Sequence, residues 1–269
     1  MIDLLADFTK RMTWADGDGS SLQAEVRSFV ASEPYLVRID LDGDEGTATL
    51  CRIIDQAAEA EIFDRCARLI GSYLDNVRAA LNYLTYALAV IDQSGNPQLR
   101  PEAVEFPIFI DKVQFRRNNR IKQLSGEHRR AIEALQPYDG QRPGLWLLHQ
   151  LAASYRHRII HPTKLGTLDK QHSVDVTNGS LKTLEVLYSG LVEDETPVLR
   201  FTVSHEAEAH AHANVAVSVC IDHSLCRGRQ CMEVINEIGR DVSEVTTTLM
   251  PLVPIFTAPE AHWVPPDRV

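Results

Sequence analysis

Hydrophobic residues recur every three or four positions between residues 57 and 92, which is the spacing of one face of an α-helix. Asp75, Arg78 and Asn82 follow the same spacing along a second, polar stripe of this predicted helix. Glycine and proline in the segment QSGNPQLRP, residues 93–101, predict its end. The apolar stripe comprises Ile62, Cys66, Leu69, Ile70, Leu74, Val77, Leu81, Leu84 and Leu88.

Three later segments also have helical patterning. They cover residues 125–135, 145–161 and about 229–249. The second of these should end near His161, because Pro162 disfavours helical geometry in the residue before it. By contrast, residues 1–21 are polar and rich in Gly and Asp after a short amphipathic start, so we expect a loose N-terminal arm.

Alternation of apolar and polar residues predicts strands in two regions. The stretch YLVRIDLDGDEGTATLCRI, residues 35–53, alternates on both sides of DGDEG and predicts a β-hairpin. Short β-rich runs separated by turn residues fill residues 172–222 and predict an antiparallel meander. The order hairpin, helices, strands, helix is typical of an α+β fold.

We therefore predict a core of long antiparallel helices, an antiparallel sheet formed by the N-terminal hairpin and the C-terminal meander, and a closing C-terminal helix. The expected organisation is an N-terminal arm at 1–33, the hairpin and helical core at 34–165, and the strands and last helix at 166–269. We expect these three parts to form one continuous globular unit, since 269 residues can bury a sizeable core.

Composition narrows the class of protein further. Hydrophobic residues make up 44% of the chain and charged residues 24%, as in ordinary globular proteins. No apolar run reaches the roughly 18 residues that a membrane helix needs, and the first residues lack a signal-peptide pattern. The five cysteines form no CxxC pair, so we expect reduced thiols in a cytoplasmic protein without a cofactor or metal site.

Charge is distributed unevenly along the chain. The net charge is −10, yet residues 115–164 hold ten Lys/Arg against three Asp/Glu, which leaves 17 basic and 34 acidic residues elsewhere. This basic segment is either a solvated helix face or a patch that attracts phosphate. The second interpretation makes RNA a possible partner, whereas we predict neither DNA nor a membrane.

The end of that segment concentrates groups suited to phosphate chemistry. The stretch YRHRIIHP, residues 155–162, contains Arg156, His157, Arg158 and His161. On a helix, His157 and Arg158 share a face with His161, whereas Arg156 lies about 140° away around the axis. Histidine side chains can accept and donate protons near pH 7, and an arginine side chain can form two parallel hydrogen bonds to two oxygens of one phosphate.

Two helical stretches carry a resemblance to a family of uncharacterised bacterial proteins. These are IGSYLDNVRAALNYLTYALA and QPYDGQRPGLWLLHQLAASYRHRIIH, which resemble the family motifs NLRSALDHL and LWxLHxL with a later DKHR. Asn76, Arg78, Ala80 and Leu81 match the first motif, and His157 and Arg158 match the second. Asn82 and Tyr83 replace an Asp and a His of the family, and Tyr155 and Arg156 replace an Asp and a Lys.

The turn is also similar to the signature of the HEPN superfamily of helical ribonucleases. Arg156, His157 and His161 give the pattern R-H-x-x-x-H, and a long amphipathic helix precedes the helix that carries it. This resemblance implies metal-independent RNA cleavage in a site shared across a homodimer, with Arg156, His157 and His161 as catalytic residues. We predict that Arg158 between them is a fourth.

A structural interpretation of the same residues stays open. Asp75, Asn76, Arg78 and Asn82 on the long helix could meet His157 and Arg158 in a buried hydrogen-bonded network that fixes the pairing of the two helices. The protein would then be a non-catalytic interaction or binding protein. A second histidine cluster at His205, His210 and His212, with Glu206 and Glu208, has a spacing that can chelate a metal, but we interpret it as an exposed polar loop.

Overall fold

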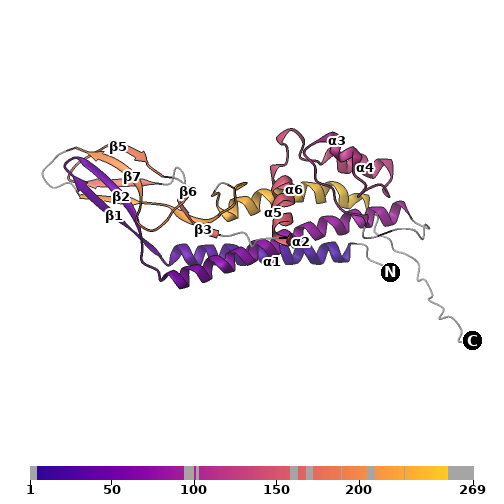
Figure 1. Ribbon diagram of the computed structural model, residues 1–269, viewed down its shortest axis with the longest axis horizontal. Helices are drawn as coiled ribbons and strands as arrows, with labels where there is room; N and C mark the ends of the chain where they lie inside the picture. The colour runs from indigo at the N-terminus through magenta and orange to yellow at the C-terminus, as the bar shows by residue number, and fades with distance from the viewer. Residues whose placement is uncertain are drawn as a thin grey trace, which may run out of the picture. The chain divides into compact units, whose positions relative to one another are not determined.

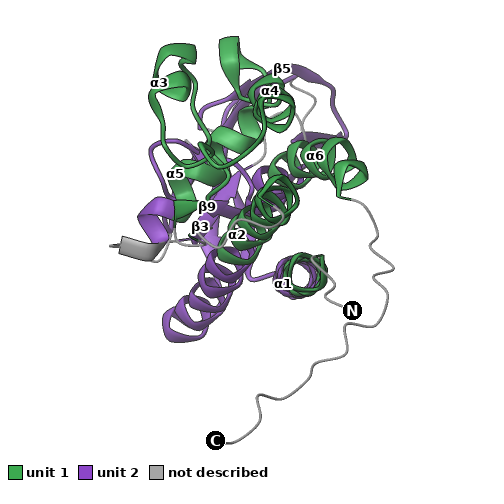
Figure 2. Ribbon diagram, turned by 90° about the vertical axis from the view of Figure 1, so that its right-hand side faces the viewer, with its two compact units in different colours: residues 1–16, 74–152, 237–269 green, residues 17–73, 153–236 purple. Residues whose placement is uncertain are grey.

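A computed structural model describes residues 5–93, 100, 103–157, 163–167, 172–188, 190–204, 210–226 and 228–253, and of Arg156 and His157 only the backbone. The chain forms two compact units (Figure 2). The first contains residues 1–16, 74–152 and 237–269, and the second contains residues 17–73 and 153–236. Four helices contribute residues to both units, so the boundaries between the units fall within helices.

The helices and strands alternate in blocks along the chain (Figure 1). The helices are α1 (Ala6–Ala31), α2 (Gln56–Asp92), α3 (Lys112–Arg117), α4 (Gly126–Ala134), α5 (Pro143–His157) and α6 (Cys231–Leu249). The strands are β1 (Tyr35–Asp42), β2 (Glu45–Arg52), β3 (Thr163–Thr167), β4 (Ser173–Thr177), β5 (Leu181–Val186), β6 (Gly190–Leu191), β7 (Thr196–Val203), β8 (His210–Asn214) and β9 (Val217–Ile221). The predicted α+β class is confirmed.

Helix α2 is the longest element and matches its prediction within one residue. It begins after Asp55, whose carboxylate accepts hydrogen bonds from the backbone N–H groups of Ala57 and Ala58 at 2.9 and 3.2 Å. Most of its predicted apolar stripe is buried, and Cys66, Ile70, Leu74, Leu81, Leu84 and Leu88 are fully enclosed. Within the part of the chain that the structure describes, no helix is both long and apolar enough to cross a membrane.

The prediction of a loose N-terminal arm is wrong, because residues 6–31 form helix α1. The helix buries an apolar stripe with spacings of seven, seven, four and three residues, formed by Phe8, Ala15, Leu22, Val26 and Phe29. In the second unit α1 runs antiparallel to α2, since Asp18 pairs with Ser72 at 2.7 Å and Glu25 with Arg65 at 3.0 Å. Burial of this stripe outweighs the unfavourable helix propensity of the Gly and Asp residues.

The second unit holds the strands, which pair antiparallel throughout the described residues. A two-residue turn with Gly43 at φ +64° joins β1 to β2, and β2 continues the sheet to β7 and β5 (Figure 1). The predicted union of the hairpin with the C-terminal strands in one sheet is therefore confirmed. These strands do not follow a simple meander: β7 lies between β2 and β5, β4 pairs with β8, and β3 lies between β6 and β9.

The first unit contains the shorter helices, each of which begins at a polar cap. Asp111 and Ser125 accept hydrogen bonds from the backbone of the first turns of α3 and α4. Asp241 of α6 accepts from the N–H groups of Gly144 and Leu145 at 2.7 and 3.3 Å, and so caps the start of α5. A side chain at position 144 would collide with the Glu237 carbonyl, so α6 can approach α5 this closely only at a glycine.

The end of α5 packs closely against α2 in the second unit. The Tyr155 ring lies over Gly71, where an added Cβ would sit 2.0 Å from the ring carbon Cε2. The described helix reaches His157, and the predicted continuation to His161 lies outside the described residues.

Replacing Gly71 with Ala should destabilise the protein by about 1 to 3 kcal/mol, because a rigid aromatic ring must move to admit the methyl group. Gly17, an exposed helical glycine of α1 with nothing within 4 Å of its added Cβ, provides the matched control. Gly17→Ala should stabilise by about 0.5 to 1 kcal/mol through reduced backbone entropy of the unfolded chain. Urea unfolding of both variants measures the difference, and equal effects would contradict the tight packing of Tyr155 on Gly71.

Candidate functional site

The predicted Arg/His turn begins on the last turn of α5. Arg156 and His157 belong to this helix, whereas Arg158 and His161 lie outside the described residues. The described residues on either side are well anchored in the second unit. Tyr155 packs on Gly71, and the hydroxyl of buried Thr163, the first residue of β3, donates to the Phe63 carbonyl at 2.8 Å.

Two of the predicted supporting residues hold a neighbouring backbone segment. The Arg78 guanidinium, which is 4% exposed, donates to the Phe106 carbonyl at 2.7 Å. The Asn82 side-chain oxygen accepts from the N–H of the same Phe106 at 3.0 Å. Since Arg78 and Asn82 are four residues apart on α2, they reach both polar groups of one residue, and these contacts serve the fold of the first unit.

Gln136, which the sequence analysis did not single out, continues this arrangement from the other side. Its amide oxygen accepts from the Phe109 N–H at 2.9 Å, and its amide nitrogen donates to the Pro107 carbonyl at 2.9 Å. The side chain is 1% exposed. Three side chains thus pair backbone groups of Phe106, Pro107 and Phe109 in the segment 104–109, which belongs to no helix or strand. The only sequence signal was a glutamine that follows the mostly polar helix α4.

The other two predicted supporting residues, Asp75 and Asn76, lie where α2 enters the first unit. Asn76 is 7% exposed, and its side-chain oxygen accepts from Arg11 of α1 at 2.8 Å. Asp75 beside it is half-buried. Asn76 therefore contacts α1, whereas Arg78 and Asn82 contact the 104–109 segment.

The predicted histidine cluster is described only in part. His210 and His212 lie exposed on β8, opposite Thr177 and Asp175 of β4, whereas residues 205–209 lie outside the described part. Among the residues that the structure describes, no group of three or more His, Cys, Asp or Glu side chains could hold a metal ion.

The basic segment 115–164 is not one surface. Arg142 forms a two-pronged ion pair with Glu244 in the first unit, with distances of 2.6 and 3.0 Å. Lys164 pairs with Asp222 at 2.8 Å in the second unit. The other exposed cations lie on α3, on α4 and in the loop between these helices. They are Arg116, Arg117, Arg120, Lys122, Arg129 and Arg130.

A pocket of about 530 Å³ in the second unit contains a buried carboxyl group that the sequence did not reveal. Glu59 is 6% exposed, and its carboxylate lies 3.2 Å from the Arg52 Nε atom. Burial, and to a smaller degree the Asp194 carboxylate, raises the pKa of Glu59 despite that ion pair. A buried carboxyl group with a raised pKa in a pocket is typical of a functional site, and a structural ion-pair network also has this form.

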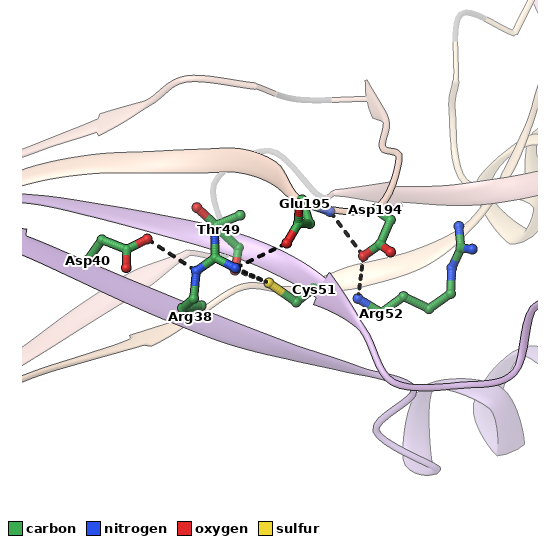
Figure 3. A network of polar contacts seen from close by, with 7 residues as sticks. All are labelled: Arg38, Asp40, Thr49, Cys51, Arg52, Asp194 and Glu195. Carbon is green, nitrogen blue, oxygen red and sulfur yellow. Dashed lines mark hydrogen bonds and ion pairs between the residues drawn. The ribbon is translucent and has the colours of Figure 1, made fainter.

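The loop that carries Asp194 is tied to the hairpin at two points (Figure 3). The Arg52 N–H donates to Asp194 Oδ1 at 2.7 Å, and Arg38 of β1 reaches Glu195 at 3.3 Å and Asp40 at 3.2 Å. The Arg38 pairs are exposed and contribute little stability. The Arg52 contact places Asp194 beside the Glu59 pocket.

Comparison of the chain with known protein families, curated proteins and solved structures finds no significant match. The motif resemblances remain expectations about the chemistry of the Arg/His turn.

Asn82→Ala should destabilise the protein by about 1 to 3 kcal/mol, because the Phe106 N–H loses its acceptor inside the protein. Asn82→Asp is the matched control, since a carboxylate also accepts this hydrogen bond and lies one helical turn from Arg78. We expect it to unfold within about 0.5 kcal/mol of the parent. Denaturant unfolding measures the stability of both variants. An Asn82→Ala variant as stable as the parent would contradict a stabilising role for the hydrogen bond between Asn82 and Phe106.

Glu59→Gln should remove a pH-dependent part of the stability. Because the pKa of Glu59 is raised in the folded state, the folded protein holds this proton more tightly, so the contribution of Glu59 falls as the pH rises from about 4.3 through the raised pKa. The free energy of unfolding of the parent minus that of Glu59→Gln should therefore decrease over this window. Thermal or urea unfolding between pH 4.5 and 8 tests this, and a difference that increases with pH would refute the direction of the shift.

Proposed function

We propose that the protein is a metal-independent endoribonuclease whose cleaving residues are Arg156, His157, Arg158 and His161. The observation that supports this most is the position of Arg156 and His157 on the last turn of α5, between the anchored residues Tyr155 and Thr163. A helix end with fixed flanks is suited to holding catalytic groups within the small tolerances that such chemistry needs.

The chemistry requires a base, a proton donor and a cation. In the proposal His161 accepts the proton of a ribose 2′-hydroxyl, and the 2′-oxygen forms a bond to the adjacent phosphorus. Arg156 holds the phosphate as negative charge develops, and His157 and Arg158 orient it. The bond to the 5′-oxygen breaks and that oxygen takes a proton from solvent water, which gives a 2′,3′-cyclic phosphate and a 5′-hydroxyl. As in the ribonucleases that the motif resembles, we propose a homodimer.

A non-catalytic interaction protein is the second candidate, and one observation favours it. Arg78 and Asn82, predicted to support the Arg/His turn, both hold the Phe106 backbone and so have a structural role. If the histidines also serve only to fix the helices, the basic surface around α3 and α4 would bind a partner without chemistry.

The two functions predict opposite behaviour of His161→Ala. A catalytic base can be removed with little effect on melting temperature, whereas removing a buried network residue leaves partners unsatisfied and costs about 1 to 3 kcal/mol. We expect the parent protein to cleave total tRNA and a single-stranded oligoribonucleotide in EDTA, and His161→Ala to lose this activity at an unchanged melting temperature.

The control is His210→Ala, since His210 is an exposed histidine of β8. It should retain both cleavage and stability. Cleavage products ending in a 2′,3′-cyclic phosphate would identify the 2′-hydroxyl as the nucleophile. An inactive parent protein together with a destabilised His161→Ala variant would exclude the nuclease and leave the interaction protein.

A further inference from the structure

Helices α3 and α4 belong to the first unit (Figure 2), and the residues that line a basic groove lie on them and beside them. It consists of two hollows of about 330 and 430 Å³ that share Arg116, Arg130 and Glu133 as lining residues. Together their linings contain five basic side chains, Lys112, Arg116, Lys122, Arg129 and Arg130, against the acidic Glu133 and Asp139. The groove therefore carries positive charge on the surface of an acidic protein.

The local fold turns these cations towards solvent. Phe115, Ile121 and Leu124 are each at most 4% exposed and bury the inner side of α3 and of the loop that leads to α4. Ser125 caps α4, and its carbonyl accepts from the Arg129 guanidinium at 3.4 Å. Because these apolar side chains are buried, the basic side chains of the same segment lie on the surface and line the groove.

Several of the groove cations are available to a ligand. In the described part of the chain no carboxylate pairs with Lys122 or Arg130, and both are exposed. The Lys112 ammonium lies over the Tyr138 ring, 5.3 Å from its centre. Arg116 pairs with Glu133 at 3.4 Å, but its side chain is 71% exposed, so this pair is weak.

We propose that the α3–α4 groove binds the backbone phosphates of single-stranded RNA. The choice of RNA rests on the proposed function, whereas the phosphate chemistry rests on the groove itself. The cations are spread over two adjoining hollows, as successive phosphates of one strand require, and arginine matches phosphate oxygens in pairs. Binding through phosphates alone is independent of base sequence.

Glu133 opposes this binding from within the groove. It lines both hollows and holds Arg116. Removing its charge releases Arg116 and raises the positive potential, so Glu133→Gln should bind RNA more tightly than the parent protein. This increase is a result that general damage to the fold would not produce.

The test uses the full-length protein and a fluorescent 2′-O-methyl oligoribonucleotide, which offers no 2′-hydroxyl for cleavage. Anisotropy gives the affinity of the parent, of Lys122→Glu with Arg130→Glu, and of Lys122→Gln with Arg130→Gln. The matched control is Arg27→Glu with Lys182→Glu, which makes the same charge change at two exposed residues of the second unit. Circular dichroism and melting temperatures confirm that all variants fold.

We expect the groove reversal to weaken binding at least about tenfold, the neutral pair to weaken it less, and the control to change it far less. The slope of log affinity against log salt should become shallower by about 1.4 in the reversal, since each phosphate contact on a single strand contributes about 0.7. Glu133→Gln should strengthen binding.

Equal weakening by groove and control variants would overturn the proposal, as would a parent protein that does not bind the oligonucleotide. A polyglutamate peptide that competes as effectively as RNA would assign the groove to acidic proteins instead. Because the oligonucleotide cannot be cleaved, failure of the nuclease proposal leaves these results unaffected. Conversely, the groove variants could cleave natural RNA at the same rate and with the same affinity as the parent protein. That result would overturn the proposal for the groove and leave the nuclease proposal intact.

Discussion

The first unit depends on satisfying the backbone of a buried segment that belongs to no sheet. Residues 104–109 form no helix or strand and are mostly buried, and an unpaired buried N–H or C=O group costs about 1 to 3 kcal/mol. Arg78 and Asn82 pair both polar groups of Phe106, and Gln136 pairs Pro107 and Phe109. With these bonds made, Phe106 and Ile108 can be fully enclosed against the helices.

This requirement explains polar residues that the sequence would assign to a catalytic site. Asn82 needs only an acceptor oxygen to hold the Phe106 N–H, so either an amide or a carboxylate suits the position. An asparagine in place of an aspartate at position 82 is therefore no evidence that a catalytic activity has been lost. The proposed chemistry takes place at the end of α5. The proposed RNA contacts are made by exposed cations on and beside α3 and α4, whose charged groups lie outside the buried core.

Sequence patterning predicted the elements whose signal is local. Helix α2 and the β1–β2 hairpin matched closely, because periodicity and turn residues lie within each segment. Helix α1 was missed, since glycines and aspartates concealed a stripe with spacings of seven, seven, four and three residues. The order β1-β2-β7-β5 and the pairing of β4 with β8 arise between distant segments and leave no local pattern. The same holds for the Glu59 pocket, which joins residues 52, 59 and 194, and for the role of Gln136.

Hydrogen–deuterium exchange of the full-length protein, with and without an uncleavable RNA, tests this division between buried scaffold and exposed functional surface most directly. The amides of Phe106 and Phe109 should be protected in both states, because they donate to the side chains of Asn82 and Gln136 in part-buried hydrogen bonds. RNA should slow exchange in the peptides that cover α3 and α4 and leave the 104–109 amides unchanged. Rapid exchange at Phe106 and Phe109 without RNA, or an RNA effect on these amides rather than on α3 and α4, would contradict it.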